Sequence, residues 1–157
     1  MNASQDLGLD VKIARSLPSN HMQAYYHKRD GIIQISSSER RMVSFGINID
    51  GLVTIDCDDS GRIVDVEIVL SRNIKSKRFD VRSMGYCERA SSIYLSADYP
   101  ERDIESLCVS QDLQDNEFAV TWGCDNFDRR VIVGQNISAL LRGQRLVGFA
   151  VGTERIP

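Results

Sequence analysis

Three carboxylates and one serine lie close together in the sequence, in a spacing that could hold a metal ion. Asp56, Asp58 and Ser60 occupy alternate positions, Gly61 follows, and Glu67 comes at the twelfth position counted from Asp56. Calcium is bound by oxygen ligands at such positions, with a glycine for a sharp turn and a last carboxylate that binds through both oxygens. The segment could therefore form a calcium site.

This spacing resembles the loop of the EF-hand calcium-binding proteins, which would imply a helix on each side of it. The flanks instead alternate apolar and polar residues over 53–58 and 64–70, a pattern typical of strands. Asp and Ser can hydrogen-bond to nearby amides and Gly61 can take a positive φ, so residues 58–61 predict a hairpin turn. Glu67 would then lie on the outer strand face, away from the tip. The sequence favours an acidic hairpin without metal or other cofactor, with calcium as the alternative.

The same hairpin carries a second resemblance. Residues 58–68 read D-x-x-G-x-I-V-x-V-E-I, which is similar to a hairpin segment of small bacterial β domains of unknown function. The resemblance implies a β fold and brings no activity with it.

Strand patterns recur along the chain and predict a mainly β protein, a β-rich α+β fold built as an antiparallel sandwich or barrel-like sheet. Asp30-Gly31 and Asp50-Gly51 are turn signals between such patterns. Residues 42–70 and 118–151 resemble each other, which suggests two similar meanders from an internal duplication within a single domain, 1–157. Further strands are expected at 11–14, 25–27, 32–35, 42–47, 92–97, 118–122, 131–133, 137–141 and 145–151.

One short helix is predicted near 99–109. Asp98 could cap its first turn and Pro100 suits the first helical positions. Ile104, Leu107 and Cys108 would then share one face.

The same region holds most of the negative charge. Between residues 98 and 117 seven acids and one base give a net charge of about −6. A segregated acidic face can steer a basic partner into contact. The predicted partner-binding residues are Asp98, Glu101, Asp103, Glu105, Asp112, Asp115 and Glu117.

Length and composition exclude several classes of function. The chain of 157 residues has a net charge of −3, which disfavours direct binding to nucleic acid. No secretion signal and no apolar run of membrane-spanning length are visible, and the four cysteines form no C-x-x-C pair. These features favour a cytoplasmic protein with small, buried cysteines and no membrane contact.

No nucleotide-binding or hydrolase motif is present. His27 is better explained as the end of a strand than as a catalytic base, and the basic segment 72–82 as a solvated connection. We therefore expect a non-catalytic protein-binding module, such as an immunity protein or antitoxin that neutralises a basic, nuclease-like toxin. Alternatives are a small-ligand or calcium-binding β domain, and an enzyme with a carboxylate site such as Asp65 and Glu67. Oligomeric state is left open.

Overall fold

The computed structural model contains only β-strands as regular elements in the residues that it describes, which confirms the prediction of a mainly β protein. The described residues are 8–14, 22–27, 29–37, 42–70, 87–89, 92–95, 103–104, 109–114, 117–122, 127–134 and 136–152. In chain order the strands are β1 (Leu9–Ala14), β2 (Met22–His27), β3 (Ile32–Ser37), β4 (Phe45–Ile49), β5 (Val53–Cys57), β6 (Ile63–Val69), β7 (Cys87–Arg89), β8 (Ser92–Leu95), β9 (Asp103–Ile104), β10 (Ser110–Gln114), β11 (Glu117–Thr121), β12 (Arg129–Gly134), β13 (Ile137–Arg142) and β14 (Arg145–Gly152).

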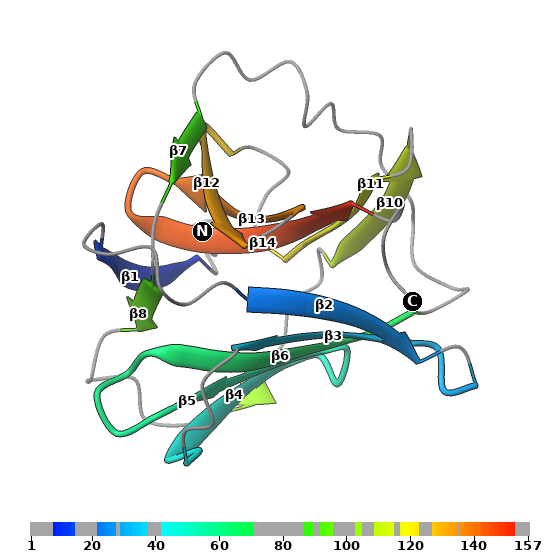
Figure 1. The fold of residues 1–157 in the computed structure, drawn as a ribbon, viewed down its shortest axis with the longest axis horizontal. Helices are drawn as coiled ribbons and strands as arrows, with labels where there is room; N and C mark the ends of the chain where they lie inside the picture. The colour runs from blue at the N-terminus through cyan, green and yellow to red at the C-terminus, as the bar shows by residue number, and fades with distance from the viewer. Residues whose placement is uncertain are drawn as a thin grey trace, which may run out of the picture.

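The strands form a curled sheet that folds into two layers (Figure 1). Hydrogen-bonded neighbours follow the order β10-β11-β14-β13-β12-β2-β3-β6-β5-β4-β9. We call β10 to β14, with β7 paired to β12, the upper layer, and β2 to β6, with β9, the lower layer. Most neighbours are antiparallel, as predicted; the parallel contacts of β12 with β2 and β7, and of β4 with β9, are short.

One connection between the layers is a single close backbone contact. Gly134 of β12 pairs with Met22 of β2, and the register between these strands contains no other pair. A Cβ added to Gly134 would lie 2.2 Å from the Met22 carbonyl oxygen, far inside ordinary contact distance. Only glycine lets the two backbones approach this closely.

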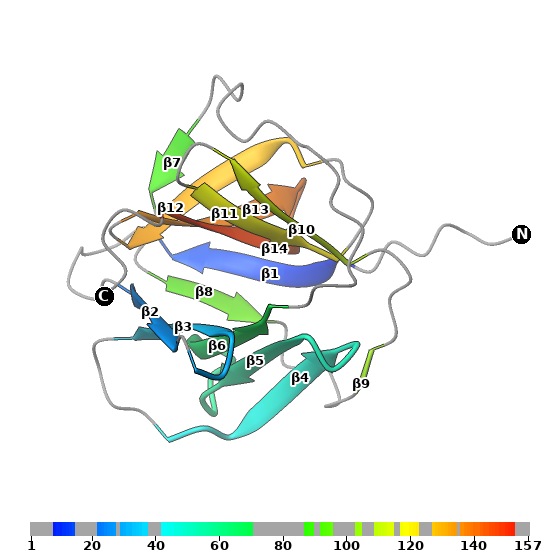
Figure 2. The same ribbon diagram turned by 90° about the vertical axis from the view of Figure 1, so that its right-hand side faces the viewer.

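A second connection runs through β1 and β8, which lie between the layers (Figure 2). The start of β1 pairs with β14, and the rest of it pairs with β8. The amide of Leu95 in β8 donates to the carbonyl of Gly61 over 2.7 Å, at the start of the lower layer's β6. Gly61 has a φ of +88°, and a Cβ there would lie 2.4 Å from the Leu95 carbonyl oxygen. Glycine is again the residue that fits.

The main core lies between the two layers and takes apolar side chains from both. Trp122 and Phe149 are its largest members; both are buried, with ring centroids 5.9 Å apart. Removal of this apolar surface from water is the main favourable contribution to folding.

The two layers differ in how their faces are buried. In the upper layer, β13 and β14 are buried at nearly every position. A second buried cluster, with Phe127 packed against it, is separate from the main core and contains Ala119, Leu140, Val147 and Ala150. In the lower layer, buried positions alternate with more exposed positions along β5, which matches one buried and one wet face.

The predicted hairpins of the lower layer are confirmed. The turn at residues 29–31 lies between β2 and β3, and residues 58–62 join β5 to β6. Asp50 and Gly51, which connect β4 to β5, have φ values of +55° and +71°. Two successive positive φ values are the signature of the type I′ turn that joins antiparallel strands without splaying them.

The predicted helix at 99–109 is wrong where the structure describes it. Asp103 and Ile104 form β9, which pairs in parallel with Asn48 and Ile49 of β4. Pairing with the edge of a sheet satisfies the backbone of these two residues, and this tertiary contact outweighs the local capping signal. Residues 99–102 and 105–108 lie outside the described residues.

Within the part of the chain that the structure describes, there is no helix long and apolar enough to cross a membrane. The internal duplication stays a prediction. Its two halves, 42–70 and 118–151, contain three and four described strands respectively.

Candidate functional site

The tip between β5 and β6 uses its first carboxylate to build the turn. Asp58 is 3% exposed, and its Oδ1 accepts hydrogen bonds from the Ser60 amide, the Ser60 hydroxyl and the Arg62 amide at 2.9, 2.6 and 3.0 Å. Strands lie on both sides of this tip, as the hairpin interpretation requires. The EF-hand resemblance would require a helix on each side. The three donors occupy the Oδ1 atom that a metal ion in such a loop would need.

The remaining acids of the hairpin gather on one face of the lower layer. Asp56 of β5 stands directly opposite Asp65 of β6 in the register. Glu67, two positions along β6, stands opposite Thr54. We call these three carboxylates, with the polar side chains between and beside them, the outer acidic face. Its polar neighbours are Gln34, Ser36, Asn48 and Thr54.

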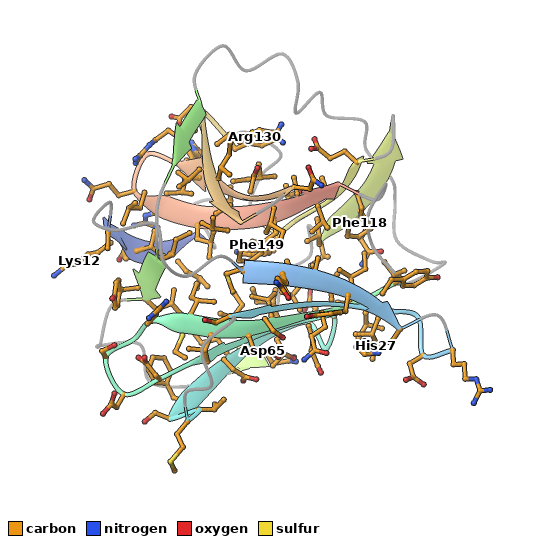
Figure 3. All side chains as sticks on the ribbon, in the orientation of Figure 1. Lys12, His27, Asp65, Phe118, Arg130 and Phe149 are labelled. Atoms are coloured by element: carbon orange, nitrogen blue, oxygen red, sulfur yellow. The ribbon has the colours of Figure 1, made fainter. Side chains whose placement is uncertain are left out.

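Hydrogen bonds hold part of this face in place. The Oδ1 of Asp65 accepts from the Gln34 amide group at 3.0 Å and from the Ser36 hydroxyl at 2.6 Å. The Oε1 of Gln34 lies 2.9 Å from Nε2 of His27, so that nitrogen carries a proton in this arrangement. Figure 3 shows Asp65 on the side of the lower layer away from Phe149, which lies between the layers. The two donors hold the Asp65 carboxylate in one orientation.

Asp56 and Glu67 have no such hydrogen bonds from described side chains. Among the described residues, no side chain donates a hydrogen bond or forms an ion pair with either carboxylate. Burial, and then the charges of Asp65 and Glu67, raise the pKa of Asp56 above its ordinary value of 3.8. Asp56 also packs against Gly46, where an added Cβ would lie 2.7 Å from its Oδ1. The carboxylate is therefore held next to its negative neighbours.

We expect the Asp56→Asn variant to be more stable than the wild type at neutral pH by about 0.5 kcal/mol, because like charges opposite each other weaken a strand pair. The folded-state pKa of Asp56 is raised, so the folded state holds its proton more tightly than the unfolded state. Protonation of Asp56 therefore stabilises the folded state. This contribution is complete below pH 3.8 and is lost as the pH rises through the folded-state pKa of Asp56. The advantage of the variant should therefore shrink as the pH falls through this window.

Urea unfolding at several pH values measures this advantage. Asp59→Asn, at an exposed position of the hairpin tip, is the matched control. A stability difference for Asp56→Asn that is constant with pH would contradict the expected repulsion.

The structure describes the backbone of only three of the seven predicted partner-binding residues, so the predicted binding surface stays a prediction. Asp103 lies in β9 and Asp112 in β10, at opposite ends of the strand order. Glu117 forms an ion pair with Arg130 at 2.7 Å, and the side chains are 18% and 20% exposed. Arg130 also donates to the Ser138 hydroxyl at 2.9 Å. The other predicted residues lie outside the described residues: Asp98, Glu101, Glu105 and Asp115.

The cysteine prediction is confirmed for one residue. Cys57 is a buried, free cysteine in the main core. Burial, and then the charges of Asp58 and Asp56, raise the pKa of its thiol to about 12. A thiol with this pKa has almost no reactive thiolate at neutral pH. The side chains of the other three cysteines lie outside what the structure describes.

The outer acidic face is only partly visible in the sequence. Alternation places Asp65 and Glu67 together on one strand face. Asp56 joins them through the register of the hairpin, which has an irregularity beside Asp56 and therefore cannot be counted out from the turn. Gln34 and Ser36 come from β3, about thirty positions upstream: 31 and 29 residues from Asp65. Only the pairing of β3 with β6 places Gln34 and Ser36 beside Asp65.

Among the residues that the structure describes, no three His, Cys, Asp or Glu side chains are arranged to hold a metal ion. No protein-family model matches the chain, and no curated protein matches it.

Proposed function

We propose that the protein is a non-catalytic binding module that takes up a basic partner protein on the outer acidic face. The observation that carries this proposal is the grouping of Asp56, Asp65 and Glu67 on one wet sheet face whose five strands, β2 to β6, contain no lysine or arginine. Like charges at this spacing repel one another, and a partner that supplies cations would relieve the repulsion.

Three acids elsewhere in the described residues are matched within the chain. Glu117 pairs with Arg130, and Asp10 lies 3.5 Å from Arg145. Asp128 accepts a hydrogen bond from the Gly143 amide at 2.9 Å. Two of the three carboxylates of the outer acidic face have no such partner among the described residues. Charge complementarity therefore favours this face over Glu117, Asp10 and Asp128 as the site for a basic partner.

The partner class in this proposal is a basic, nuclease-like toxin, with the protein acting in the bacterial cytoplasm as its immunity protein or antitoxin. A toxin that acts on nucleic acid presents a positively charged surface. An acidic sheet face that covers such a surface would block the toxin without any catalysis.

Charge reversal tests the proposal. A partner is first isolated by affinity capture with the tagged protein, and its association rate is then measured at low and moderate salt. Glu67→Lys should slow association about tenfold at low salt and reduce the salt dependence, because it removes electrostatic steering at the centre of the face. The change should leave folding intact, since Glu67 is exposed.

Two further variants make the result specific. Asp59→Lys produces the same charge change at the hairpin tip and should have little effect. Reversal of Glu101, Asp103 and Glu105 to lysine tests the acidic segment predicted from the sequence. Equal association rates for the wild type and Glu67→Lys would remove the outer acidic face from the binding function.

A further inference from the structure

The described strands leave one edge of the lower layer unpaired along most of β2. β2 pairs with β3 at all six of its residues, without a register shift. On its other side, β2 meets β12 only at Met22. From Gln23 to His27, no described strand pairs with this second edge. The backbone amides and carbonyls that point outward there form a template for another strand.

This edge lacks the features by which proteins usually prevent unwanted pairing. Residues 23–26 contain no lysine, no proline and no charged side chain, and the strand has no bulge. Exposed edges of natural sheets are commonly protected by one of these devices. Tyr25 and Tyr26, which point to opposite faces, are each 40% exposed and are among the few large apolar side chains left open to solvent. An unprotected edge flanked by exposed aromatic rings is typical of a recognition edge.

The rows of side chains across the sheet connect this edge to the outer acidic face. Tyr25 stands opposite Gln34, which stands opposite Glu67. A strand added beside β2 would lie about 4.8 Å from it and would place every second side chain on the same face. The hydroxyl of Tyr25 donates to Gln23 at 2.7 Å, which holds the tyrosine ring over this part of the sheet.

We propose that the basic partner presents an extended, arginine-bearing segment that adds to the sheet as a strand along the open edge of β2. This inference rests on the proposed function and specifies how the partner is recognised. Backbone hydrogen bonds to β2 supply the pairing. An arginine opposite Tyr25 stacks on the ring and directs its guanidinium along the row that runs from Tyr25 through Gln34 to Glu67. Arginine fits better than lysine because its planar group can both stack on an aromatic ring and bind a carboxylate through two hydrogen bonds.

The test uses defined peptides as probes for the full-length protein. The first is an eight-residue peptide of alternating arginine and valine; the second replaces arginine by lysine, and the third is the arginine peptide with alternate backbone nitrogens methylated. N-methylation removes the amide donors that strand addition needs and keeps every charge. Isothermal titration at low salt should show the methylated peptide binding at least tenfold more weakly than its parent.

Variants of β2 test the role of the tyrosine. Tyr25→Ala should weaken binding of the arginine peptide about threefold, the typical size of an exposed cation–π contact, and should change binding of the lysine peptide less. Tyr25→Phe keeps the ring and should restore arginine binding, which separates a recognition role from a loss of folding. Tyr94→Ala, a change in β8 away from this edge, is the control.

The outcomes distinguish this inference from the proposed function. If the methylated peptide binds as tightly as its parent, and both lose affinity in Glu67→Lys, strand addition is overturned and charge-based binding stands. If neither the arginine peptide nor the lysine peptide binds the wild type at low salt, the strand-addition inference is overturned, and the association rates of Glu67→Lys with the captured partner decide the proposed function separately. Sedimentation experiments that show a dimer abolished by Tyr25→Ala would assign the edge to a second copy of the chain and overturn the inference.

Discussion

Replacement of Gly134 by alanine should destabilise the protein by about 3 kcal/mol or more, or prevent folding altogether. The added Cβ would lie 2.2 Å from the Met22 carbonyl oxygen and 3.0 Å from its carbonyl carbon. Both atoms belong to the backbone, so no side-chain rotation can relieve the clash, and β12 and β2 must separate. Overpacking that displaces backbone costs about 1–3 kcal/mol and occasionally more, and here it opens a connection between the layers.

A second glycine provides the control. Gly143, between β13 and β14, has a φ of +62°, and no atom lies within 4 Å of an added Cβ. Gly143→Ala should therefore cost only about 1 kcal/mol, for the unfavourable positive φ. Urea unfolding of both variants measures the difference. If Gly134→Ala were as stable as Gly143→Ala, the close contact between β12 and β2 would not exist.

The second large effect is expected at the tip of the β5–β6 hairpin. Asp58→Ala should cost about 3 kcal/mol, because three hydrogen-bond donors lose their common acceptor and one of them, the Arg62 amide, is buried. Asp58→Asn keeps an acceptor oxygen at the same position. It should therefore cost only about 1 kcal/mol, with unfolding by urea as the measurement.

The same variants separate a structural role from calcium binding. If Asp58 stabilises the turn through its hydrogen bonds, the loss of stability in Asp58→Ala should be the same in EDTA and in millimolar calcium. Calcium should also leave the melting temperature of the wild type unchanged, since ligands that bind the folded state stabilise it. A rise in the wild-type melting temperature with calcium, absent in both variants, would restore the calcium alternative for residues 56–67.

Local sequence signals predict the hairpins of the lower layer well. Period-two alternation identifies β5 and β6, and the turn residues at 30–31, 50–51 and 58–61 separate the strands correctly. These signals succeed because each hairpin is set by residues close together in the chain.

Features that depend on distant residues could not be predicted in this way. Gly134 is an ordinary turn glycine in the sequence, and only the path of the sheet brings it against Met22. The spacing of Ile104, Leu107 and Cys108 fits a helix, yet residues 103–104 pair with β4. The sequence predicts no strand at β10, because its residues, SQDLQ, are mainly polar and carry a weak strand pattern.

The candidate site also combines features that nearby residues determine with features that depend on distant residues. The carboxylates of Asp65 and Glu67 could be placed on one face from alternation alone. Their grouping with Asp56, and the support from Gln34 and Ser36, depends on how three strands are aligned. The open edge of β2 depends on which strands do not reach it, and no local pattern contains that information.

The most direct test of the central claim is a titration of the isotope-labelled protein with the alternating arginine–valine peptide, followed by amide chemical shifts. Binding at the outer acidic face and the β2 edge predicts the largest shift changes in residues 23–27 and around Glu67, with β10 and β14 unaffected. Changes confined to β9 and β10, around Asp103 and Asp112, would contradict this account and return the binding surface to the acidic segment of 98–117.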